Sequence, residues 1–321
     1  MHHSPSTGWC QTARMAPGSR PVLVLDSASL YYRAFYALPE KMTAPDGRPH
    51  NAVRGFLSTL TRLVDAHDPG GIVACWDNDW RPAWRVELVP SYKAHRVGED
   101  EEPASLGPQA RAIAGLLEAL GIARWGVDGY EADDVIGSVT AQFGQPTVVV
   151  TGDRDLVQLI DARTSVLLTV NGGMEKWPLL DPEGAEERFG VPPARYLDLA
   201  ILRGDPSDGL PGVPGIGAKT AVALVSAFGS VDGILAAARE PTPVRPLTPR
   251  LAAALLAHED SLARTLRVAQ VVRDLPLPAG VAPVPREPVA SDEVAALTAE
   301  WGVQRQVDDL RGALRRQTED E

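Results

Sequence analysis

Nine acidic residues in this sequence follow apolar stretches or stand in short polar motifs, where carboxylates could do chemistry. They are Asp26, Asp77, Glu131, Asp133, Asp134, Asp153, Asp155, Asp205 and Asp208. If they gather in one place they repel one another, because like charges at close range resist joint ionisation. Bound divalent cations are the simplest way to remove that repulsion. Sites made only of oxygen ligands suit Mg²⁺ or Mn²⁺ better than Zn²⁺.

The chemistry that such a cluster predicts is hydrolysis of a phosphodiester. Two divalent ions about 4 Å apart can activate a water molecule and stabilise the leaving oxygen of the phosphate. We therefore expect two or more ions, either Mg²⁺ or Mn²⁺. Zinc ligation is not predicted, because the six histidines are scattered and the two cysteines, Cys10 and Cys75, form no ligand pattern.

The densest acidic motif is Tyr130-Glu131-Ala132-Asp133-Asp134, which opens a predicted helix. Glu131 and Asp134 are three residues apart and therefore share one helical face. Acids in a first turn also favour the helix dipole, and Asp128 with Glu131 has the spacing of a capping box. Those ordinary roles account for one or two acids, but they do not account for three carboxylates together.

Two further motifs carry paired acids. Asp153 and Asp155 lie in a turn that follows an apolar run, while Asp205 and Asp208 lie three residues apart in a Gly-Asp-Pro-Ser-Asp motif. A single aspartate at the end of a strand is most often a turn former or a helix N-cap. Three strands that each end near an aspartate make that explanation insufficient.

Short β-branched runs that alternate with amphipathic stretches are expected to position these acids. The predicted strands are Val22–Leu25, Ile72–Trp76 and Thr147–Thr151, and the predicted helices between them are Ala52–Ala66, Leu106–Leu120 and Ala132–Phe143. This alternation predicts an α/β fold with a mainly parallel sheet flanked by helices. Ligands bind outside the carboxyl ends of such strands, which would bring Asp26, Asp77 and Asp153 together.

A glycine-rich stretch, Leu210–Ala221, follows the last acids. Glycines let a backbone approach a phosphate closely, and the next helix N-terminus offers free N–H groups to it. A purely structural hairpin is the alternative interpretation. The predicted DNA contacts in this stretch are Gly212, Gly215, Gly217, Lys219 and Thr220.

The net charge of −11 argues at first against a nucleic-acid partner, because phosphate binding usually needs a basic surface. Many of the acids fall in the motifs above, however, so net charge does not decide the question. Only four of the 31 basic residues are lysines, and two of these, Lys93 and Lys219, lie in candidate motifs. Lysine offers a compact, mobile charge that arginine does not reproduce.

The 321-residue chain divides into four predicted parts. They are a flexible leader (1–19), a catalytic domain (20–191), a helical DNA-binding domain (192–290) with a helix–hairpin–helix at 210–229, and a tail (291–321). A polar segment at about 92–108 interrupts the catalytic domain. No apolar run is long enough to span a bilayer, and the N-terminus lacks a secretory layout, so we expect a cytoplasmic protein without a membrane partner.

Together the motifs resemble the 5′ nuclease family, the flap endonuclease-like 5′-3′ exonucleases found alone or as the N-terminal nuclease domain of bacterial DNA polymerase I. The matching stretches are VLVLDSASLYYRAFYAL, the WD after the second strand, SYKAHR, GYEADDVIGS, TGDRDLVQLI and GDPSDGLPGVPGIGAKTA. The resemblance implies a twisted, mainly parallel sheet of the PIN and 5′ nuclease type. It also implies a helical arch at about 92–108 and a C-terminal helical domain of the helix-hairpin-helix type.

The resemblance assigns roles to single residues as well. One metal ion would be held chiefly by Asp26, Asp77, Glu131, Asp133 and Asp134, and the other chiefly by Asp153, Asp155, Asp205 and Asp208. Lys93 would contact the scissile phosphate, Arg96 would assist it, and Tyr92 would stack on a nucleobase. Lys93, Arg96 and Asp134 form the implied catalytic set. A monovalent cation at the hairpin is implied too.

By the same resemblance, a metal-activated water attacks DNA near a 5′ end, flap or nick, in primer removal and repair. The implied partners are such DNA and a separate DNA polymerase, and we expect a monomer. Gly209 stands where the family commonly has asparagine, and a slightly longer spacing after Asp77 leaves the role of Arg85 open. No polymerase domain follows in this sequence, so we expect a stand-alone nuclease.

Three other functions account for parts of the pattern. A PIN-like ribonuclease shares the sheet but usually lacks the long hairpin element. A catalytically inert, structure-specific DNA-binding protein would be expected to lose several acids, whereas all nine are present. A phosphatase or phosphotransferase with strand-end aspartates leaves Gly212–Thr220 unexplained. The balance of exonuclease and flap cleavage, and the choice between DNA and an RNA/DNA hybrid, stay open.

Overall fold

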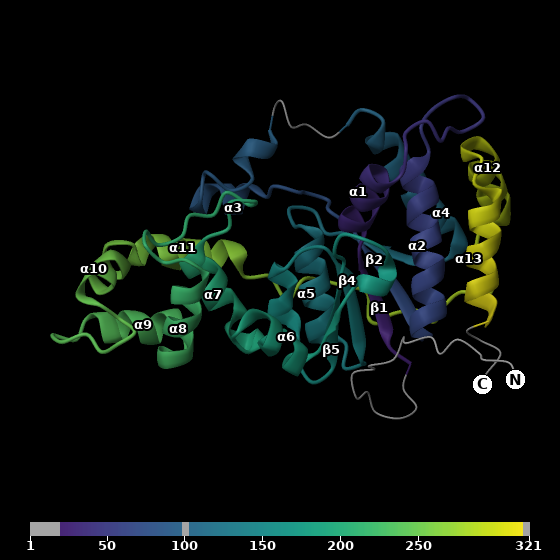
Figure 1. The fold of residues 1–321 in the computed structure, drawn as a ribbon. Helices are drawn as coiled ribbons and strands as arrows, with labels where there is room; N and C mark the ends of the chain where they lie inside the picture. Colours follow the sequence, from purple (N-terminus) through teal and green to yellow (C-terminus); the bar gives the residue numbers. More distant parts are fainter. Residues whose placement is uncertain (1–19, 98–102, 317–321) are drawn as a thin grey trace, which may run out of the picture.

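The computed structural model describes residues 20–97 and 103–316 (Figure 1). The predicted leader, the middle of the predicted arch and the last five residues lie outside the described residues. The described chain forms an α/β layer structure joined to a helical region, with α8, α9 and α10 farthest from the sheet (Figure 1).

Six strands form one twisted sheet in the order β3-β2-β1-β4-β5-β6. Their bounds are β1 (Val22–Asp26), β2 (Gly71–Cys75), β3 (Ala123–Trp125), β4 (Thr147–Thr151), β5 (Thr164–Leu168) and β6 (Leu179–Leu180). All neighbouring pairs are parallel except β5 with β6, which is antiparallel. The sheet is therefore mainly parallel, as the sequence predicts.

Each central strand is buried on both faces, which explains why its sequence is a continuous apolar run. Side chains alternate between the faces. Leu23 and Leu25 of β1 belong to one hydrophobic core, whereas Val22 and Val24 belong to the other. The sheet thus separates two cores, and both need helices to cover them.

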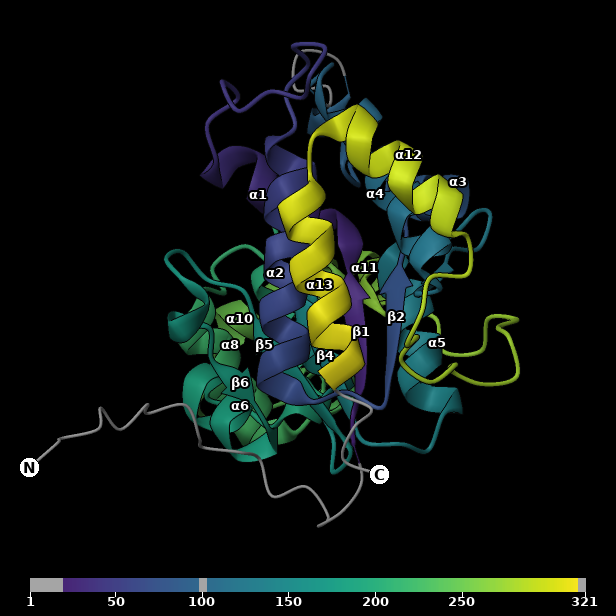
Figure 2. The same ribbon diagram turned by 90° about the vertical axis from the view of Figure 1, so that its right-hand side faces the viewer.

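One face is covered by α1, α2 and α4 together with two helices from the far end of the chain (Figure 2). Their bounds are α1 (Ser27–Ala37), α2 (Asn51–His67), α4 (Leu106–Leu120), α12 (Ser291–Trp301) and α13 (Gln304–Arg316). The opposite core includes residues of α5 (Ala132–Gln142), η2 (Asp155–Leu159) and α6 (Pro182–Phe189).

The helical region follows α6 and shares the second core with the sheet. Its elements are η4 (Pro193–Arg195), α7 (Tyr196–Arg203), α8 (Ala218–Phe228), α9 (Val231–Ala238), α10 (Pro249–Ala257) and α11 (Glu259–Ala269). Three shorter helices complete the described chain: α3 (Ala83–Leu88), η1 (Ala94–Arg96) and η3 (Met174–Lys176). The helix α3 contacts α11 and so links the two regions.

After α11 the chain returns to the sheet. Gln142 of α5 donates a hydrogen bond to the Leu275 carbonyl oxygen at 2.9 Å, and Val284 N donates to Gly70 O at 3.2 Å. The chain then forms α12 and α13, and α13 packs on α2 through Val307, Leu310 and further apolar residues. The segment predicted as a tail is therefore part of the nuclease core as far as residue 316.

Predicted and observed elements agree closely where the apolar pattern is strong. Thr147–Thr151 and Leu106–Leu120 have the predicted bounds, and each of the other predicted strands and helices differs by one residue at one end or at both. Within residues 20–97 and 103–316, no single helix is long and apolar enough to cross a membrane; only α8 and α9 taken together, bent by 84°, reach that length and composition.

Replacement of Leu310 by alanine tests whether α13 belongs to the core. Leu310 is fully buried against α2, so Leu310→Ala should lower the free energy of unfolding by about 2–5 kcal/mol in a urea titration. Leu256→Ala is the matched control, because Leu256 is 36% exposed and its loss should cost about 0.5 kcal/mol or less. Equal effects of the two changes would contradict the packing.

Candidate active site

The carboxyl ends of β1, β2 and β4 bring the strand-end aspartates to one edge of the sheet. Asp26 caps α1, and its carboxylate accepts hydrogen bonds from Ser29 N at 3.0 Å and from Thr151 Oγ1 at 2.7 Å. Asp77 accepts from Ala132 N at 2.8 Å. These bonds tie β1 to β4 and the end of β2 to the start of α5, as the parallel topology predicts.

The second acidic pair follows β4. Asp153 accepts a hydrogen bond from Asp155 N at 2.8 Å, while its own N–H donates to Thr151 Oγ1 at 2.8 Å. Asp155 begins η2, and its Oδ1 atom is buried without a hydrogen-bonding partner among the residues described. A buried carboxylate oxygen without a partner lowers the stability of the fold. A bound cation would offset this cost.

Asp205 and Asp208 lie in the loop between α7 and α8. Asp205 accepts from Ser207 N at 2.8 Å and from the Ser207 hydroxyl. Asp208 accepts from Arg96 at 2.6 Å. Electrostatic interactions of both Asp205 and Asp208 with Asp153 connect this loop to the acids after β4.

The first turn of α5 is arranged differently from the prediction. Glu131 is the N-cap, and Glu131 and Asp134 form the capping box, so the predicted pair of Asp128 and Glu131 is wrong. Asp128 instead accepts a hydrogen bond from Asn78 at 2.8 Å. The N-cap position therefore lies three residues later than the sequence spacing suggested.

Asp134 is fully buried and its two oxygens accept four hydrogen bonds. Arg85 donates two of them, at 2.7 and 2.9 Å, and the backbone N–H groups of Val272 and Glu131 donate the others, at 2.9 and 3.2 Å. These donors occupy the positions that a metal ion would need. The predicted roles of Asp134 as a metal ligand and a catalytic residue stay predictions, and in this structure protein donors surround its carboxylate.

Glu131 is also buried, and three side chains hold it. Arg85 and Lys93 form ion pairs with it, and the Tyr92 hydroxyl donates to it at 2.8 Å. Tyr92 is only 4% exposed in this structure, and the stacking of its ring on a nucleobase stays a prediction. Lys93 lies at the base of the predicted arch with its ammonium group against Glu131.

The base of the predicted arch is bound to the loop that carries Asp208. Lys93 N donates to Asp208 O at 2.9 Å, the Ser91 hydroxyl donates to Gly209 O at 2.7 Å, and Arg96 donates to Ser207 O at 2.9 Å. In the described part of the predicted arch, η1 is the one helical turn; residues 98–102 lie outside the described residues, and α4 already begins at Leu106.

Gly209, the departure from the family pattern, has a physical explanation here. Its backbone φ is +67°, a value that residues with a side chain rarely adopt. A Cβ at this position would also overlap the carbonyl oxygen of Ser91. The absence of a side chain lets the two loops approach each other. The glycine therefore belongs to the contact between the arch base and the acidic loop.

The glycine-rich hairpin lies between α7 and α8. Val213 and Ile216 are buried and anchor it, and Gly212 packs against the Arg203 backbone so closely that a Cβ would overlap it. Gly217 is the N-cap of α8 and has open space around it, while Lys219 is exposed in the first turn. Gly215 and half-buried Thr220 complete the predicted contacts; DNA binding by these five residues stays a prediction.

Burial and mutual repulsion make these acids hard to ionise. Burial raises the pKa of Asp26 to about 7, against the opposing effect of hydrogen bonds from Thr151 and Ser29. Burial, followed by the charge of Asp153, raises the pKa values of Asp133 and Asp155 well above the ordinary range. The pKa values of Asp77 and Asp153 are raised as well, chiefly by burial.

The chemistry of this donor set fits a hard divalent cation, because it consists of carboxylates and one of their buried oxygens lacks a partner in the described part of the chain. Within the described residues, no three His, Cys, Asp or Glu side chains stand in a geometry that could hold one ion as they are. Binding would therefore require some carboxylates to turn toward the ion.

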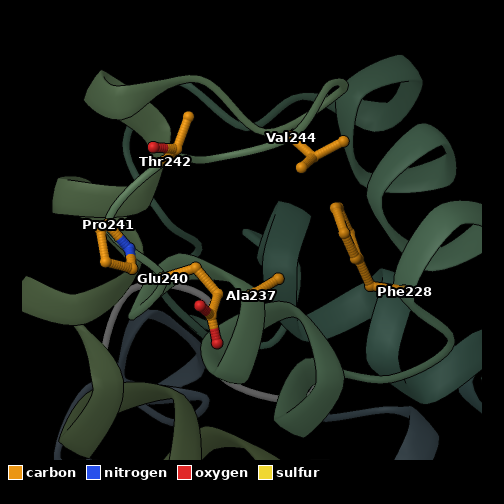
Figure 3. Close-up of a pocket in the computed structure, with 6 residues that line it drawn as sticks. All are labelled: Phe228, Ala237, Glu240, Pro241, Thr242 and Val244. Carbon is orange, nitrogen blue, oxygen red and sulfur yellow. The ribbon is translucent and has the colours of Figure 1, made fainter.

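A cavity of about 350 Å³ lies elsewhere, in the helical region (Figure 3). Its lining residues are Phe228, Ala237, Glu240, Pro241, Thr242 and Val244. The ring of Phe228 and the side chain of Val244 approach each other across it (Figure 3). None of the predicted site residues lines this cavity, so it does not belong to the acidic site.

Arg85 is the site residue whose role the sequence left open. Its guanidinium is buried, joins Glu131 and Asp134, and donates to Val268 O of α11 at 3.0 Å. No local pattern marks it, because its partners lie 46 to 183 residues away. The only signal available in the sequence was the presence of an arginine between Asp77 and Lys93.

Two family descriptions match this sequence in succession. A 5′-3′ exonuclease N-terminal resolvase-like domain matches residues 21–190, and a 5′-3′ exonuclease C-terminal SAM fold matches residues 191–292. The first match contains the sheet and the second contains the helical region with its hairpin. Together they cover most of the chain.

Similar proteins from bacteria are 5′-3′ exonucleases or DNA polymerases, in agreement with these matches. A 5′-3′ exonuclease of Streptomyces coelicolor is 50% identical over 290 residues, 88% of this chain and 96% of the relative. A 5′-3′ exonuclease of Mycobacterium tuberculosis is 43% identical over 315 residues, 92% of this chain and 98% of the relative. DNA polymerase I of Mycobacterium leprae is 38% identical over 264 residues, 81% of this chain but 28% of the polymerase.

A solved structure shares the fold. The bacteriophage T5 flap endonuclease, in a complex with DNA and metal ions, superposes with a TM-score of 0.61 at 18% identity, and covers 94% of this chain and 100% of its own. At this identity the likeness establishes the architecture of sheet and helical region, and it leaves the roles of single residues open.

Gly209→Ala tests the contact between the arch base and the acidic loop. A methyl group would collide with Ser91 O and force the loops apart, so the variant should lose about 2 kcal/mol or more of unfolding free energy relative to its control. The control is Gly47→Ala, because Gly47 has a similar positive φ, +88°, but open space. Urea titrations of both variants measure the difference, and equal losses would contradict the contact.

The raised pKa values predict how stability depends on pH. Burial raises the pKa of Asp26 from its ordinary value of 3.8 to about 7 in the folded protein, so the folded state binds more protons than the unfolded state between these values. The metal-free protein should therefore melt at a higher temperature at pH 5.5 than at pH 8. Asp26→Asn should flatten this dependence in melting scans with EDTA. If the melting temperature of that variant depended on pH as strongly as in the wild type, Asp26 would be excluded as a cause of the dependence.

Proposed function

The chain is a member of the 5′-3′ exonuclease family and a phosphodiester hydrolase, and from that premise we propose that it cuts DNA at flaps, nicks and 5′ ends with Mg²⁺ or Mn²⁺. The observation that supports metal dependence most directly is the acidic edge of the sheet. There, buried and half-buried carboxylates have raised pKa values, and Asp155 Oδ1 has no hydrogen-bonding partner within residues 20–97 and 103–316. When bound, divalent cations supply an activated water and charge for the leaving oxygen.

Two groups of acids would hold the ions. Asp26, Asp77 and Asp133 stand at the ends of β1 and β2 and in the first turn of α5. A second group follows β4 and α7 and consists of Asp153, Asp155, Asp205 and Asp208. Glu131 borders the first group but is held by Arg85, Tyr92 and Lys93.

Lys93 and Arg96 would meet the scissile phosphate. Both already neutralise acids, Lys93 at Glu131 and Arg96 at Asp208. A phosphate that enters between these pairs would take over one or both cations as partners. A cation aimed at the non-bridging oxygens stabilises the charge that develops there in the transition state.

The hairpin before α8 would bind the DNA backbone. Gly217 leaves open space at the helix N-terminus, where free N–H groups attract phosphate, and exposed Lys219 adds a charge. Backbone contacts position DNA without reading its sequence, so recognition would depend on structure and on salt. We place the monovalent cation implied by the family at this hairpin.

In the cell, we propose that the protein acts in the cytoplasm as a monomer and removes primers and flaps beside a separate DNA polymerase. The likeness to the nuclease part of DNA polymerase I supports this role, because that part stands beside a polymerase in one chain. The phage relative solved with DNA and metal ions supports the substrate and the cofactor.

Three of the four lysines allow a matched test of this function. On a 5′-labelled flap DNA with Mg²⁺, Lys93→Ala should lower kcat about 10²–10³-fold, because it removes a transition-state charge contact. Lys219→Ala should raise KM and reduce the slope of log affinity against log salt by about one. Lys41→Ala is the control, since Lys41 is exposed and lies outside the motifs. Wild-type protein that binds the flap but never cuts it with Mg²⁺ or Mn²⁺ would refute the proposal.

A further inference from the structure

Asp133 and Asp134 are neighbours in the first turn of α5, yet their surroundings are opposite. A carboxylate has about four lone-pair positions for hydrogen bonds, and Asp134 uses four, with donors from α3, α5 and the segment after α11. The side chain of Asp133 forms no hydrogen bond or ion pair with any residue in the part of the chain that the structure describes.

The two carboxylates also differ in the charges around them. Asp134 is paired with the guanidinium of Arg85. Asp133 instead interacts chiefly with Asp153 and Asp26, two acids of the sheet edge, and the charge of Lys93 offsets their repulsion only in part. One member of the pair is neutralised by the protein itself, and the other adds to the crowded negative charge.

Arg85 connects Asp134 to the helical region. Its Nε donates to Val268 O near the end of α11, and Asp134 accepts from Val272 N just beyond that end. The ring of Trp84 lies 4.6 Å from the guanidinium and covers it. The start of α5 is therefore fixed at two points to the place where the helical region returns to the sheet.

We propose that Asp134 is a positioning residue, which with Arg85 fixes the first turn of α5 to the helical region, and that Asp133 is the metal ligand of this turn. This inference rests on the proposed metal-dependent function. It divides between two residues a role that their shared motif assigns to both. Any displacement of α11 would then reach Asp133 through Arg85 and Asp134.

The isosteric variants Asp133→Asn and Asp134→Asn separate the two roles. Each is titrated with Mn²⁺, and the free ion is followed by electron paramagnetic resonance. Asp133→Asn should weaken Mn²⁺ binding by about tenfold or more, because affinity depends on the number of charged oxygen ligands. Asp134→Asn should leave the affinity and the number of ions unchanged when measured well below its melting temperature.

In melting scans with EDTA, we expect Asp134→Asn to be the variant with the larger loss, in contrast to the Mn²⁺ titration. Asp134→Asn should lower the melting temperature by about 5–10 °C, because it leaves buried Arg85 without its charge partner. Asp133→Asn should raise it, because one of the crowded charges is gone. A merely packed, inert residue at 133 would not combine higher metal-free stability with weaker Mn²⁺ binding.

Arg85→Lys keeps the inference testable if Asp134→Asn fails to fold. Lysine keeps the charge but loses the paired contact with Asp134 and the bond to Val268 O, so the variant should bind Mn²⁺ normally and show lower kcat on flap DNA. Combined with Asp134→Asn, it should lower the melting temperature by less than the sum of the single effects.

The outcomes distinguish a failure of this inference from a failure of the proposed metal-dependent function. Weaker Mn²⁺ binding by Asp134→Asn, to the same degree as by Asp133→Asn, would overturn the division of roles and leave metal-dependent cleavage intact. Wild-type protein that binds no Mn²⁺ would overturn the proposed function and the assignment of Asp133 with it.

Discussion

The structure depends on a single electrostatic constraint: a parallel sheet directs several buried or half-buried carboxylates to one edge. Asp26, Asp77 and Asp153 arrive there because parallel strands end on the same side. N–H and O–H donors from neighbouring elements reduce the resulting repulsion, and so do Arg85 and Lys93 beside Glu131. This compensation is incomplete. Among the described residues, Asp155 Oδ1 has no hydrogen-bonding partner, and the acids around Asp133 outweigh the charge of Lys93. The carboxylates that the protein itself does not neutralise are available to bind cations from solution.

Much of this could be predicted from the sequence, because the relevant signals are local. Continuous β-branched runs mark strands buried on both faces, and helical periodicity marks Leu106–Leu120 without error at either end. The convergence of Asp26, Asp77 and Asp153 follows from parallel topology alone. The hairpin before α8 is recognisable because its glycines and its buried Val213 and Ile216 alternate in a fixed order.

The sequence could not reveal which acids the protein itself neutralises. Asp134 looks like Asp133 in the motif, and only the approach of Arg85 from α3 and of Val272 from beyond α11 separates them. Tyr92 looks like an exposed stacking residue until its hydroxyl is seen on Glu131. Gly209 is explained by a carbonyl oxygen more than a hundred residues away in sequence. Contacts over such separations are set by tertiary packing, which local propensity does not encode.

The packing of α13 on α2 has a consequence for biosynthesis. Residues 304–316 leave the ribosome after the sheet and the whole helical region, yet they complete the core over the first helices. Domains usually fold as units during synthesis, N-terminal parts first. Here the early part of the chain must wait with an apolar face of α2 exposed until α13 arrives. The nascent chain therefore passes through an aggregation-prone interval in which chaperone binding to that face would be of most use.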